Sequence, residues 1–203
     1  MIGVLALQGA FIEHERMLAR LGVEPREVRQ RKHLEGIGGL IIPGGESTTI
    51  GKLLDSLGMT EPLRGMARDG LPVWGTCAGL IMLATDVGRP QTVLSLMDMT
   101  VRRNAFGSQL DSFETDLAVP ALGPVPFHAV FIRAPIVARV GPDVTVLATL
   151  GDGTIVAAER DNLMATSFHP ELTEDPRFHE YFLAKVAARA GVGSRQTAVG
   201  SRG

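Results

Sequence analysis

The chain has 203 residues, of which 45% are hydrophobic and 21% charged, and its formal net charge is −2. This is the composition of an ordinary globular protein with one main domain, and the charge gives no electrostatic reason to expect nucleic acid or an anionic membrane as a partner. The single cysteine permits no internal disulfide, and we find neither a leader pattern nor an apolar run of the roughly 20 residues that span a bilayer. We therefore expect a cytoplasmic protein.

The first half of the chain reads as strands that alternate with helices. Short apolar runs at residues 2–7, 39–42 and 72–75 predict strands, and stretches with helical character follow at 11–21, 49–57 and 80–84. This alternation predicts a parallel sheet covered on both faces, with ligands bound at the carboxyl ends of the strands. Gln8, Gly45 and Cys77 all fall at such ends.

The second half changes to shorter strand-like segments, at residues 93–101, 113–116, 130–133, 145–150, 154–159 and 163–168. Several would pair antiparallel across turns such as Gly151-Asp152-Gly153. A final helix is predicted over residues 177–190, with its apolar stripe packed on the sheet. We expect an α/β fold with a three-layer, open, mostly parallel sheet, helices on both faces and added antiparallel strands. Residues 1–190 would form one domain and residues 191–203 a flexible tail.

The single cysteine lies in the run Gly75-Thr76-Cys77-Ala78-Gly79, between a strand-like and a helix-like stretch. This is the Gly-x-nucleophile-x-Gly pattern of a strand-turn-helix elbow, in which small neighbours let the chain pass closely. Unpaired N–H groups at the start of the next helix favour a thiolate, and the Ala78 N–H would form half of an oxyanion hole. A lone cysteine is more often a small buried hydrophobe. The elbow and a distant histidine motif favour catalysis here.

That histidine motif, Ser167-Phe168-His169-Pro170-Glu171, offers a base and an acid. Covalent catalysis by cysteine needs a general base and a group that holds the base in one tautomer. Residues two apart on extended backbone face the same way, so both side chains could project into one cleft. We assign His169 as the base and Glu171 as the orienting acid. Without Cys77, the pair would read as an ordinary strand-to-helix turn.

The run Gly44-Gly45-Glu46-Ser47-Thr48-Thr49 follows a predicted strand and opens a predicted helix. It could be a phosphate cradle with Ser47 or Thr48 as helix cap, but it lacks the Gly-Lys-Ser/Thr signature of a P-loop. We prefer the alternative in which its backbone N–H groups complete the oxyanion hole while Glu46 and Ser47 hold a polar substrate. The remaining histidines show no recognisable metal spacing, so no metal is predicted.

Together the motifs resemble the class I (triad) glutamine amidotransferases, whose cysteine attacks the side-chain amide of glutamine and releases ammonia. Further runs narrow the resemblance to the glutaminase subunits of pyridoxal 5'-phosphate synthase. These runs are Leu5-Ala6-Leu7-Gln8-Gly9-Ala10-Phe11 with Glu13-His14, Gly44-Gly45-Glu46-Ser47-Thr48-Thr49, Arg103-Asn104-Ala105-Phe106-Gly107, Asp111-Ser112-Phe113-Glu114, Val130-Phe131-Ile132-Arg133-Ala134-Pro135 and Ser167-Phe168-His169-Pro170-Glu171-Leu172. The resemblance extends to about Ala190.

The resemblance implies a flavodoxin-like fold that needs no cofactor and hydrolyses L-glutamine to L-glutamate and ammonia through a γ-glutamyl thioester. It implies a triad of Cys77, His169 and Glu171, an oxyanion hole of Gly45 and Ala78, and glutamine contacts from Gly45, Glu46, Ser47, Arg103, Ile132 and Arg133. Arg103 would clamp the α-carboxylate of glutamine and Glu46 its α-ammonium. In the family, the region of Gln8 faces a barrel synthase subunit, which uses the ammonia to make pyridoxal 5'-phosphate.

The chain departs from this family pattern in places. Ser108 stands where the family commonly has a basic residue, and Pro126-Phe127-His128-Ala129 stands where a Pro-Gly pair is expected; we expect His128 to be a surface or packing residue. Rival functions also stay open. A stand-alone thiol hydrolase of γ-glutamyl peptides would need no partner, and a catalytically silent regulatory subunit would release no ammonia.

Overall fold

The frame of the molecule is a sheet whose first strands are short and buried. The computed structural model describes residues 1–103 and 112–199, with side chains as far as residue 191, so Ser108 and residues 104–107 of the arginine run lie outside the described residues. The strands are β1 Ile2–Leu5, β2 Pro25–Val28, β3 Leu40–Ile42, β4 Val73–Thr76, β5 Ala84–Asp86, β6 Met97–Arg102, β7 Ser112–Leu117, β8 Phe127–Ile132, β9 Ile136–Val140, β10 Thr145–Thr149, β11 Ile155–Arg160 and β12 Leu163–Thr166. The α-helices are α1 Phe11–Arg20, α2 Ser47–Ser56, α3 Thr60–Arg68, α4 Ala78–Leu83 and α5 Arg177–Val199, and the 3₁₀ helices are η1 Arg31–Leu34, η2 Pro120–Leu122 and η3 Pro170–Leu172.

Ten strands of the described part of the chain form one sheet, and β7 and β8 pair separately. The order along the main path is β2-β1-β3-β4-β12-β11-β9-β6-β5, with β10 paired to β11. Each neighbouring pair from β2 to β12 is parallel, whereas β12, β11, β9 and β6 pair antiparallel. The predicted α/β fold with a parallel first half and added antiparallel strands is therefore confirmed.

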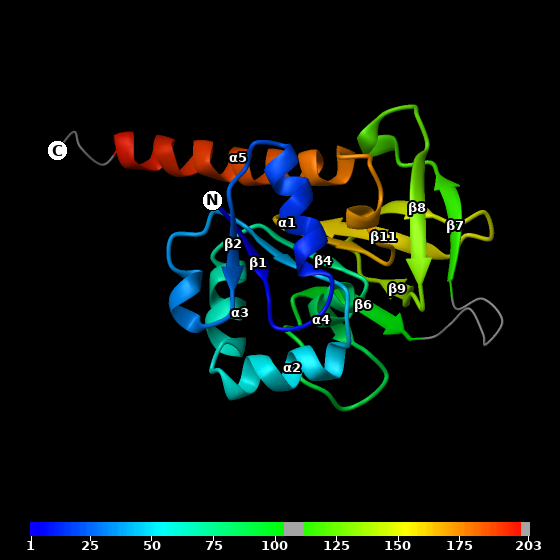
Figure 1. Ribbon diagram of the computed structural model, residues 1–203, viewed down its shortest axis with the longest axis horizontal. Coiled ribbons are helices and arrows are strands. Elements are labelled where there is room, and N and C mark those ends of the chain that lie inside the picture. Colours follow the sequence, from blue (N-terminus) through cyan, green and yellow to red (C-terminus); the bar gives the residue numbers. More distant parts are fainter. Residues whose placement is uncertain (104–111, 200–203) are drawn as a thin grey trace.

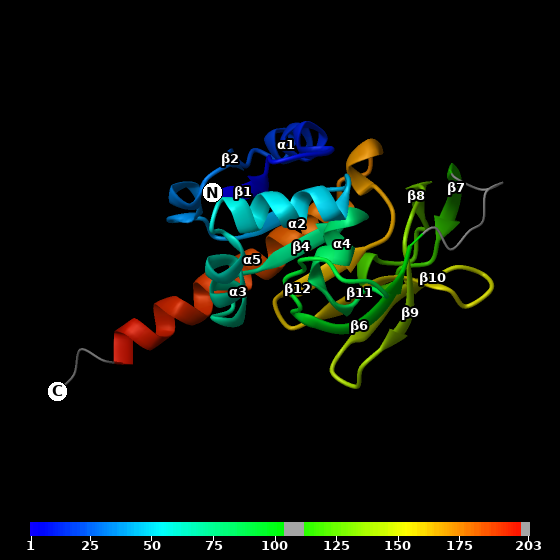
Figure 2. The same ribbon diagram turned by 90° about the horizontal axis from the view of Figure 1, so that it is seen from below.

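Both faces of the central parallel strands β1, β3, β4 and β12 are buried. Leu40, Ile42 and Val73 belong to a hydrophobic cluster that includes α2, α3 and α4, whereas Ile41 and Trp74 belong to a second cluster that includes α1 and α5. Successive residues of a strand point to opposite faces, which explains why these strands are apolar throughout. Figures 1 and 2 show the resulting layers, with α1 and α5 on one side of the sheet and α2 on the other.

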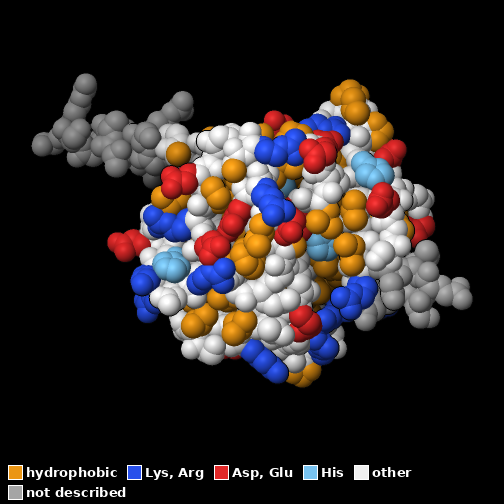
Figure 3. Space-filling view, viewed as in Figure 1, with side chains coloured by type: hydrophobic (Ala, Val, Ile, Leu, Met, Phe, Trp, Pro, Cys, Tyr) orange, Lys and Arg blue, Asp and Glu red, His pale blue; other side chains and the backbone are white. Residues whose placement is uncertain are grey.

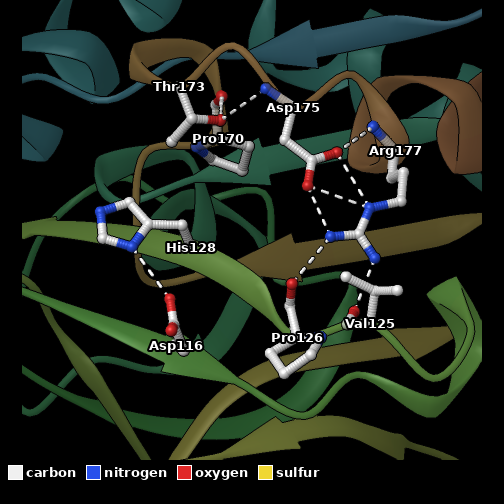
Figure 4. A network of polar contacts seen from close by, with 8 residues as sticks. All are labelled: Asp116, Val125, Pro126, His128, Pro170, Thr173, Asp175 and Arg177. Atoms are coloured by element: carbon white, nitrogen blue, oxygen red, sulfur yellow. Dashed lines mark hydrogen bonds and ion pairs between the residues drawn. The ribbon is translucent and has the colours of Figure 1, made fainter.

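The β7–β8 pair is tied to the main body by the beginning of α5. Arg177 donates to the carbonyl oxygens of Val125 at 2.7 Å and Pro126 at 2.9 Å, and its guanidinium also pairs with Asp175 (Figure 4). These carbonyls lie directly before β8. The contact therefore fixes the strand whose other end, Ile132, reaches the cavity described below.

His128 lies on the exposed side of β8 and does not line that cavity. Its Nδ1 lies 3.0 Å from Asp116 Oδ1, drawn in Figure 4, and its Nε2 lies 2.9 Å from Glu114 Oε2. Hydrogen bonds to these two carboxylates of β7 raise the pKa of His128 above its ordinary value. The expectation that His128 is a surface residue is confirmed.

Some predicted elements differ from the observed ones. The strand expected over residues 93–101 begins only at Met97, because the N–H groups of Leu94 and Leu96 donate to the carbonyls of Met82 and Leu83 at the end of α4 instead of to a strand. The elements α3, β2, β5 and β9 were not predicted. Helix α5 continues to Val199, past the expected end near residue 190, and so covers much of the segment predicted as a tail. Within the described residues, no helix has both the length and the apolar character needed to cross a bilayer.

Candidate active site

A cavity of about 410 Å³ opens at the carboxyl ends of the parallel strands. Its lining residues are Gln8, Gly9, Ala10, Gly44, Gly45, Glu46, Cys77, Ala78, Ile81, Arg103, Ile132, Arg133, Pro135, His169 and Leu172. Gln8 follows β1, Gly45 follows β3, Cys77 follows β4 and His169 follows β12, and these strands are neighbours in the sheet. The cavity thus has the position that ligand sites take in open α/β sheets.

Cys77 occupies the sharp turn between β4 and α4. Its backbone has φ 49° and ψ −102°, a conformation that a residue with a Cβ adopts only when its surroundings enforce it. The Cys77 N–H donates to the carbonyl of Thr166 on β12 at 2.8 Å. A Cβ on Gly79 would lie 2.0 Å from the carbonyl oxygen of Ile42, so only glycine lets α4 begin this close to β3. The predicted elbow is present.

His169 and Glu171 come from the turn between β12 and η3. The backbone N–H of His169 donates to the carbonyl of Val130 on β8 at 2.9 Å, which fixes the base relative to that strand. Its Nδ1 lies 2.7 Å from Glu171 Oε1, and the side chain of Glu171 is fully buried. Burial lowers the pKa of His169, but hydrogen bonds and charge interactions with Cys77 and Glu171 outweigh it and raise the pKa to about 10. The structure therefore brings the three predicted catalytic side chains together.

The Gly44–Gly45 segment passes directly over these side chains. A Cβ on Gly44 would lie 2.3 Å from Cε1 of His169, so the close approach requires glycine. The Gly44 carbonyl accepts the N–H of Ala10 at 3.0 Å, and the N–H of Glu46 donates to Gln8 Oε1 at 2.6 Å. The loop after β1 therefore supports the loop after β3, and Gln8 lies at the cavity as predicted.

Glu46 and Arg103 face each other at one side of the cavity. Arg103 Nη2 donates to Glu46 Oε1 at 2.7 Å, and the other carboxylate oxygen of Glu46 accepts the N–H of Thr49 at 2.9 Å. Burial raises the pKa of Glu46, but hydrogen bonds from Thr48, Arg103 and Thr49 outweigh it and lower the pKa to about 2. Glu46, and not Ser47 or Thr48, is thus the N-cap of α2. The cap that the phosphate-cradle alternative would have used is therefore not the one observed, because the longer carboxylate side chain of Glu46 reaches the free N–H group of Thr49 in the first turn.

Of the remaining predicted glutamine contacts, two line the cavity and one does not. Ile132 and Arg133 line the cavity, and the carbonyl oxygen of Ile132 lies 4.0 Å from Cys77 Sγ. Arg133 has a positive φ of 44°, which is unusual for arginine. This conformation changes the direction of the chain directly after β8. Ser47 is buried, does not line the cavity, and its hydroxyl accepts a hydrogen bond from Gln91 at 3.2 Å.

Sequence reasoning missed some residues of the site. Pro135, Ile81 and Leu172 line the cavity, and His14 lies fully buried behind Glu171. The Glu13-His14 pair stood in a family-like run, but nothing in its spacing connected it to Glu171, which is more than 150 residues away. Among the described residues, no group of three or more His, Cys, Asp or Glu side chains is arranged so that it could hold a metal ion.

Solved structures share this fold. A structure described as a glutamine amidotransferase aligns with a TM-score of 0.87 at 51% identity, and covers 92% of this chain and 98% of that one. A structure of PurLQS from Thermotoga maritima aligns with a TM-score of 0.65 at 17% identity, which shows the fold alone. A cysteine elbow, a histidine and a glutamate at the end of this sheet define the class of triad glutamine amidotransferases.

Sequence comparisons identify the family within this class. The model of the SNO glutamine amidotransferase family matches residues 4–188. The chain is 61% identical over 186 residues to the pyridoxal 5'-phosphate synthase subunit PdxT of Herpetosiphon aurantiacus, a match that covers 90% of this chain and 98% of the relative. It is 60% identical over 186 residues to the PdxT of a Roseiflexus species. The chain belongs to the SNO glutamine amidotransferase family.

Proposed function

We propose that this chain is the glutaminase of a pyridoxal 5'-phosphate synthase: it hydrolyses L-glutamine to L-glutamate and passes the ammonia to a synthase subunit. The observation that carries the proposal is the presence of Cys77 and His169 in one cavity, with the buried Glu171 bonded to His169 behind it, in a chain whose relatives at 61% and 60% identity are named as subunits of that synthase. The rival functions, a stand-alone γ-glutamyl hydrolase and a silent regulatory subunit, receive no support from these relatives.

The proposed chemistry begins with the sulfur of Cys77. His169, held as an imidazolium by its raised pKa, stabilises the thiolate, and Glu171 fixes the imidazole through Nδ1. The thiolate attacks the side-chain amide carbon of glutamine, and the N–H groups of Gly45 and Ala78 stabilise the oxyanion. His169 then donates its proton to the leaving ammonia. The γ-glutamyl thioester that remains is hydrolysed by a water that His169 deprotonates, which releases glutamate.

The polar wall of the cavity suits the α-amino acid end of glutamine. Arg103 would bind the α-carboxylate and Glu46 the α-ammonium, while Gly45, Ile132 and Arg133 contact the chain between them through the loops that line the cavity. Arg103 and Glu46 pair with each other in the structure. Binding of glutamine exchanges this pair for two substrate contacts. Ser47 contributes through the backbone at the start of α2, since its hydroxyl is turned to Gln91.

The ammonia requires a second protein, because ammonia released into bulk water becomes ammonium. We propose a barrel-shaped synthase subunit that docks over the cavity mouth near Gln8, receives the ammonia through a channel, and combines it with a pentose phosphate and a triose phosphate. The exposed apolar side chains of Ile132 and Leu172 at the cavity, and of Ile12 on α1, support a docking face there. The cytoplasm stays the predicted location.

The decisive experiment measures ammonia release from glutamine by the chain alone, by the chain with its synthase subunit, and by the Cys77→Ala variant of each. We expect release that rises when the synthase is added and is abolished by Cys77→Ala. Equal rates with and without the synthase would favour the stand-alone hydrolase. No release under any condition would leave only the regulatory subunit.

A further inference from the structure

A row of buried side chains continues behind the triad. Glu171 uses Oε1 to hold His169, and its Oε2 lies 3.4 Å from Nε2 of His14 on α1. Nδ1 of His14 lies 2.9 Å from Nε2 of His179 on α5, and Nε2 of His14 lies 3.2 Å from Oγ1 of Thr76. His14, Thr76 and His179 are fully buried. Helix α1, strand β4 and helix α5, which are distant in the chain, therefore meet behind the Glu171 carboxylate.

The hydrogen-bonding pattern decides where the protons of this row sit. Between His14 and His179 one nitrogen must donate and the other accept, and Nδ1 of His179 has no partner. If His14 Nδ1 carried the proton, the proton of His179 would have to sit on the partnerless Nδ1, and a lone pair of His14 would face the Glu171 carboxylate. Both would be costly in a buried site. The other arrangement, with both protons on Nε2, leaves only an acceptor unpaired and points the His14 N–H at Glu171 and Thr76.

Both imidazoles of the row are neutral. Burial, followed by the charge interactions with His179 and His169, lowers the pKa of His14 well below its ordinary value, and burial lowers the pKa of His179 to about 3. A neutral donor can fix a carboxylate without competing with its charged partner. Glu171 therefore keeps His169 as its cationic partner. His14 helps to orient the Glu171 carboxylate and brings no second positive charge to it.

The rings are held in place by packing as well as by hydrogen bonds. Trp74 meets His14 edge to face with ring centroids 5.4 Å apart and meets His179 in the same way at 4.8 Å. The Trp74 indole N–H donates to Oγ1 of Thr166 at 3.2 Å, so the indole ring is itself fixed to β12. The arrangement leaves the buried imidazoles little freedom to turn.

We propose that His14 is a positioning residue for the glutaminase reaction: its Nε2–H holds the second carboxylate oxygen of Glu171, and His179 sets the tautomer of His14 that makes this possible. Glu171 Oε2 makes no hydrogen bond at the present separation, and His14 Nε2 is the donor that the structure places beside it. Catalytic hydrogen bonds are often long without substrate and tighten in the reacting complex. Thr76, directly before Cys77, ties the same imidazole to the nucleophile elbow.

Two substitutions at one position separate this role from simple packing. The amide nitrogen of glutamine can take the place of His Nε2, so His14→Gln keeps a donor toward Glu171; the shorter asparagine reaches only the place of Nδ1, so His14→Asn loses that donor. In the complex with the synthase subunit, we expect His14→Asn to lower kcat by roughly 10- to 100-fold with KM for glutamine unchanged, the effect of losing a charge-assisted hydrogen bond. His14→Gln should stay within about 3-fold of wild type by the same reasoning. Equal kcat in the two variants would overturn the proposal, whether both keep the wild-type value or both fall.

A second measurement needs no variant and no activity. Nitrogen-15 NMR of the histidine rings in the wild-type chain should find both His14 and His179 neutral, with the proton on Nε2. A proton on Nδ1 of His14 would overturn the proposal even if His14 variants fail to fold. The inference rests on the proposed glutaminase function for its kinetic readout alone, so a chain that releases no ammonia in any form would reject that function and leave the tautomer result to decide the role of His14.

Discussion

At the scale of single residues, the site depends on one imidazole with a shifted proton affinity. His169 is nearly buried, which by itself would make it neutral, but a sulfur on one side and a carboxylate on the other raise its pKa to about 10. A pKa above the pH of the solution means that the imidazolium persists. In the proposed reaction, the same group first stabilises the thiolate and later supplies the proton that ammonia needs.

This charge balance predicts the titration of His169. In the wild type, its NMR signals should remain those of an imidazolium as the pH rises through neutrality, because the pKa lies above the ordinary value. Cys77→Ala removes the hydrogen bond and the charge interaction with the sulfur that raise the pKa of His169, so this pKa should fall and the signals should change at lower pH. An unaltered titration in Cys77→Ala would show that the sulfur does not interact with the imidazole.

Two neighbouring arginines give a matched test of substrate binding. Arg103 lines the cavity and pairs with Glu46, whereas Arg102 is exposed and does not line it. We expect Arg103→Ala to raise KM for glutamine roughly 10- to 100-fold, the effect of one lost charge-assisted contact, with a smaller change in kcat. Arg102→Ala should leave KM near the wild-type value. Steady-state kinetics would reject the assignment if the two variants behaved alike.

At the scale of elements, the elbow exists because α4 begins almost in contact with two strands. A Cβ on Gly75 would lie 2.3 Å from the carbonyl oxygen of Gly79, and a Cβ on Gly79 would lie 2.0 Å from that of Ile42. Helix α4 is buried along its whole length, so it has no room to move outward. The close packing of α4 against β3 and β4 holds Cys77 in its unfavourable backbone conformation with a positive φ.

The close packing predicts opposite effects for two glycine substitutions in helices. Gly79→Ala should destabilise the fold by about 1–3 kcal/mol, because the added methyl group meets backbone that cannot yield. Gly65→Ala in α3 should stabilise it by about 0.5–1 kcal/mol, because the site is exposed, nothing lies within 4 Å of the added atom and alanine favours helix. Urea unfolding of both variants gives the two values. A destabilised Gly65→Ala or a neutral Gly79→Ala would contradict this account.

At the scale of the whole molecule, the edge of the sheet that carries the cavity is also the side that we expect the partner to cover. Hydrophobic side chains gather beside a hollow between the regions of α1 and β8 in Figure 3. Leu172, which lines the cavity, and Ile12, in the first turn of α1, are exposed to 43% and 45%, which is high for large aliphatic side chains. Leu57, exposed to 39%, lies instead at the far end of α2.

These exposed side chains predict where the synthase docks. Ile12→Asp should lower the stimulation of glutaminase activity by the synthase about tenfold, because a charge placed in an apolar contact is costly to desolvate. Leu57→Asp, a similar change away from the cavity, should leave the stimulation unaltered. The measurement is ammonia release as the synthase is titrated in. A loss for Leu57→Asp, or none for Ile12→Asp, would move the docking face elsewhere.

Most of the fold class and the family could be predicted from local sequence. Alternation of apolar runs with helical spacing was enough for the parallel half, and the elbow and the His-x-Glu pair were readable because both patterns are short and contiguous. Elements that depend on distant contacts were missed. The segment at residues 93–96 looked like a strand, but its N–H groups bond to the end of α4, and β9 pairs with strands far along the chain.

The amino-acid sequence by itself determined the proposed reacting groups, because Cys77, His169 and Glu171 stand in motifs whose local geometry follows from their neighbours. Only the tertiary structure decided what surrounds them. The pairing of Arg103 with Glu46, the support of Glu46 by Gln8 and the position of His14 behind Glu171 join segments that are far apart in the chain. The physical reason is that β12 inserts beside β4 and α5 packs against α1, and such long-range contacts leave no periodic trace in the sequence.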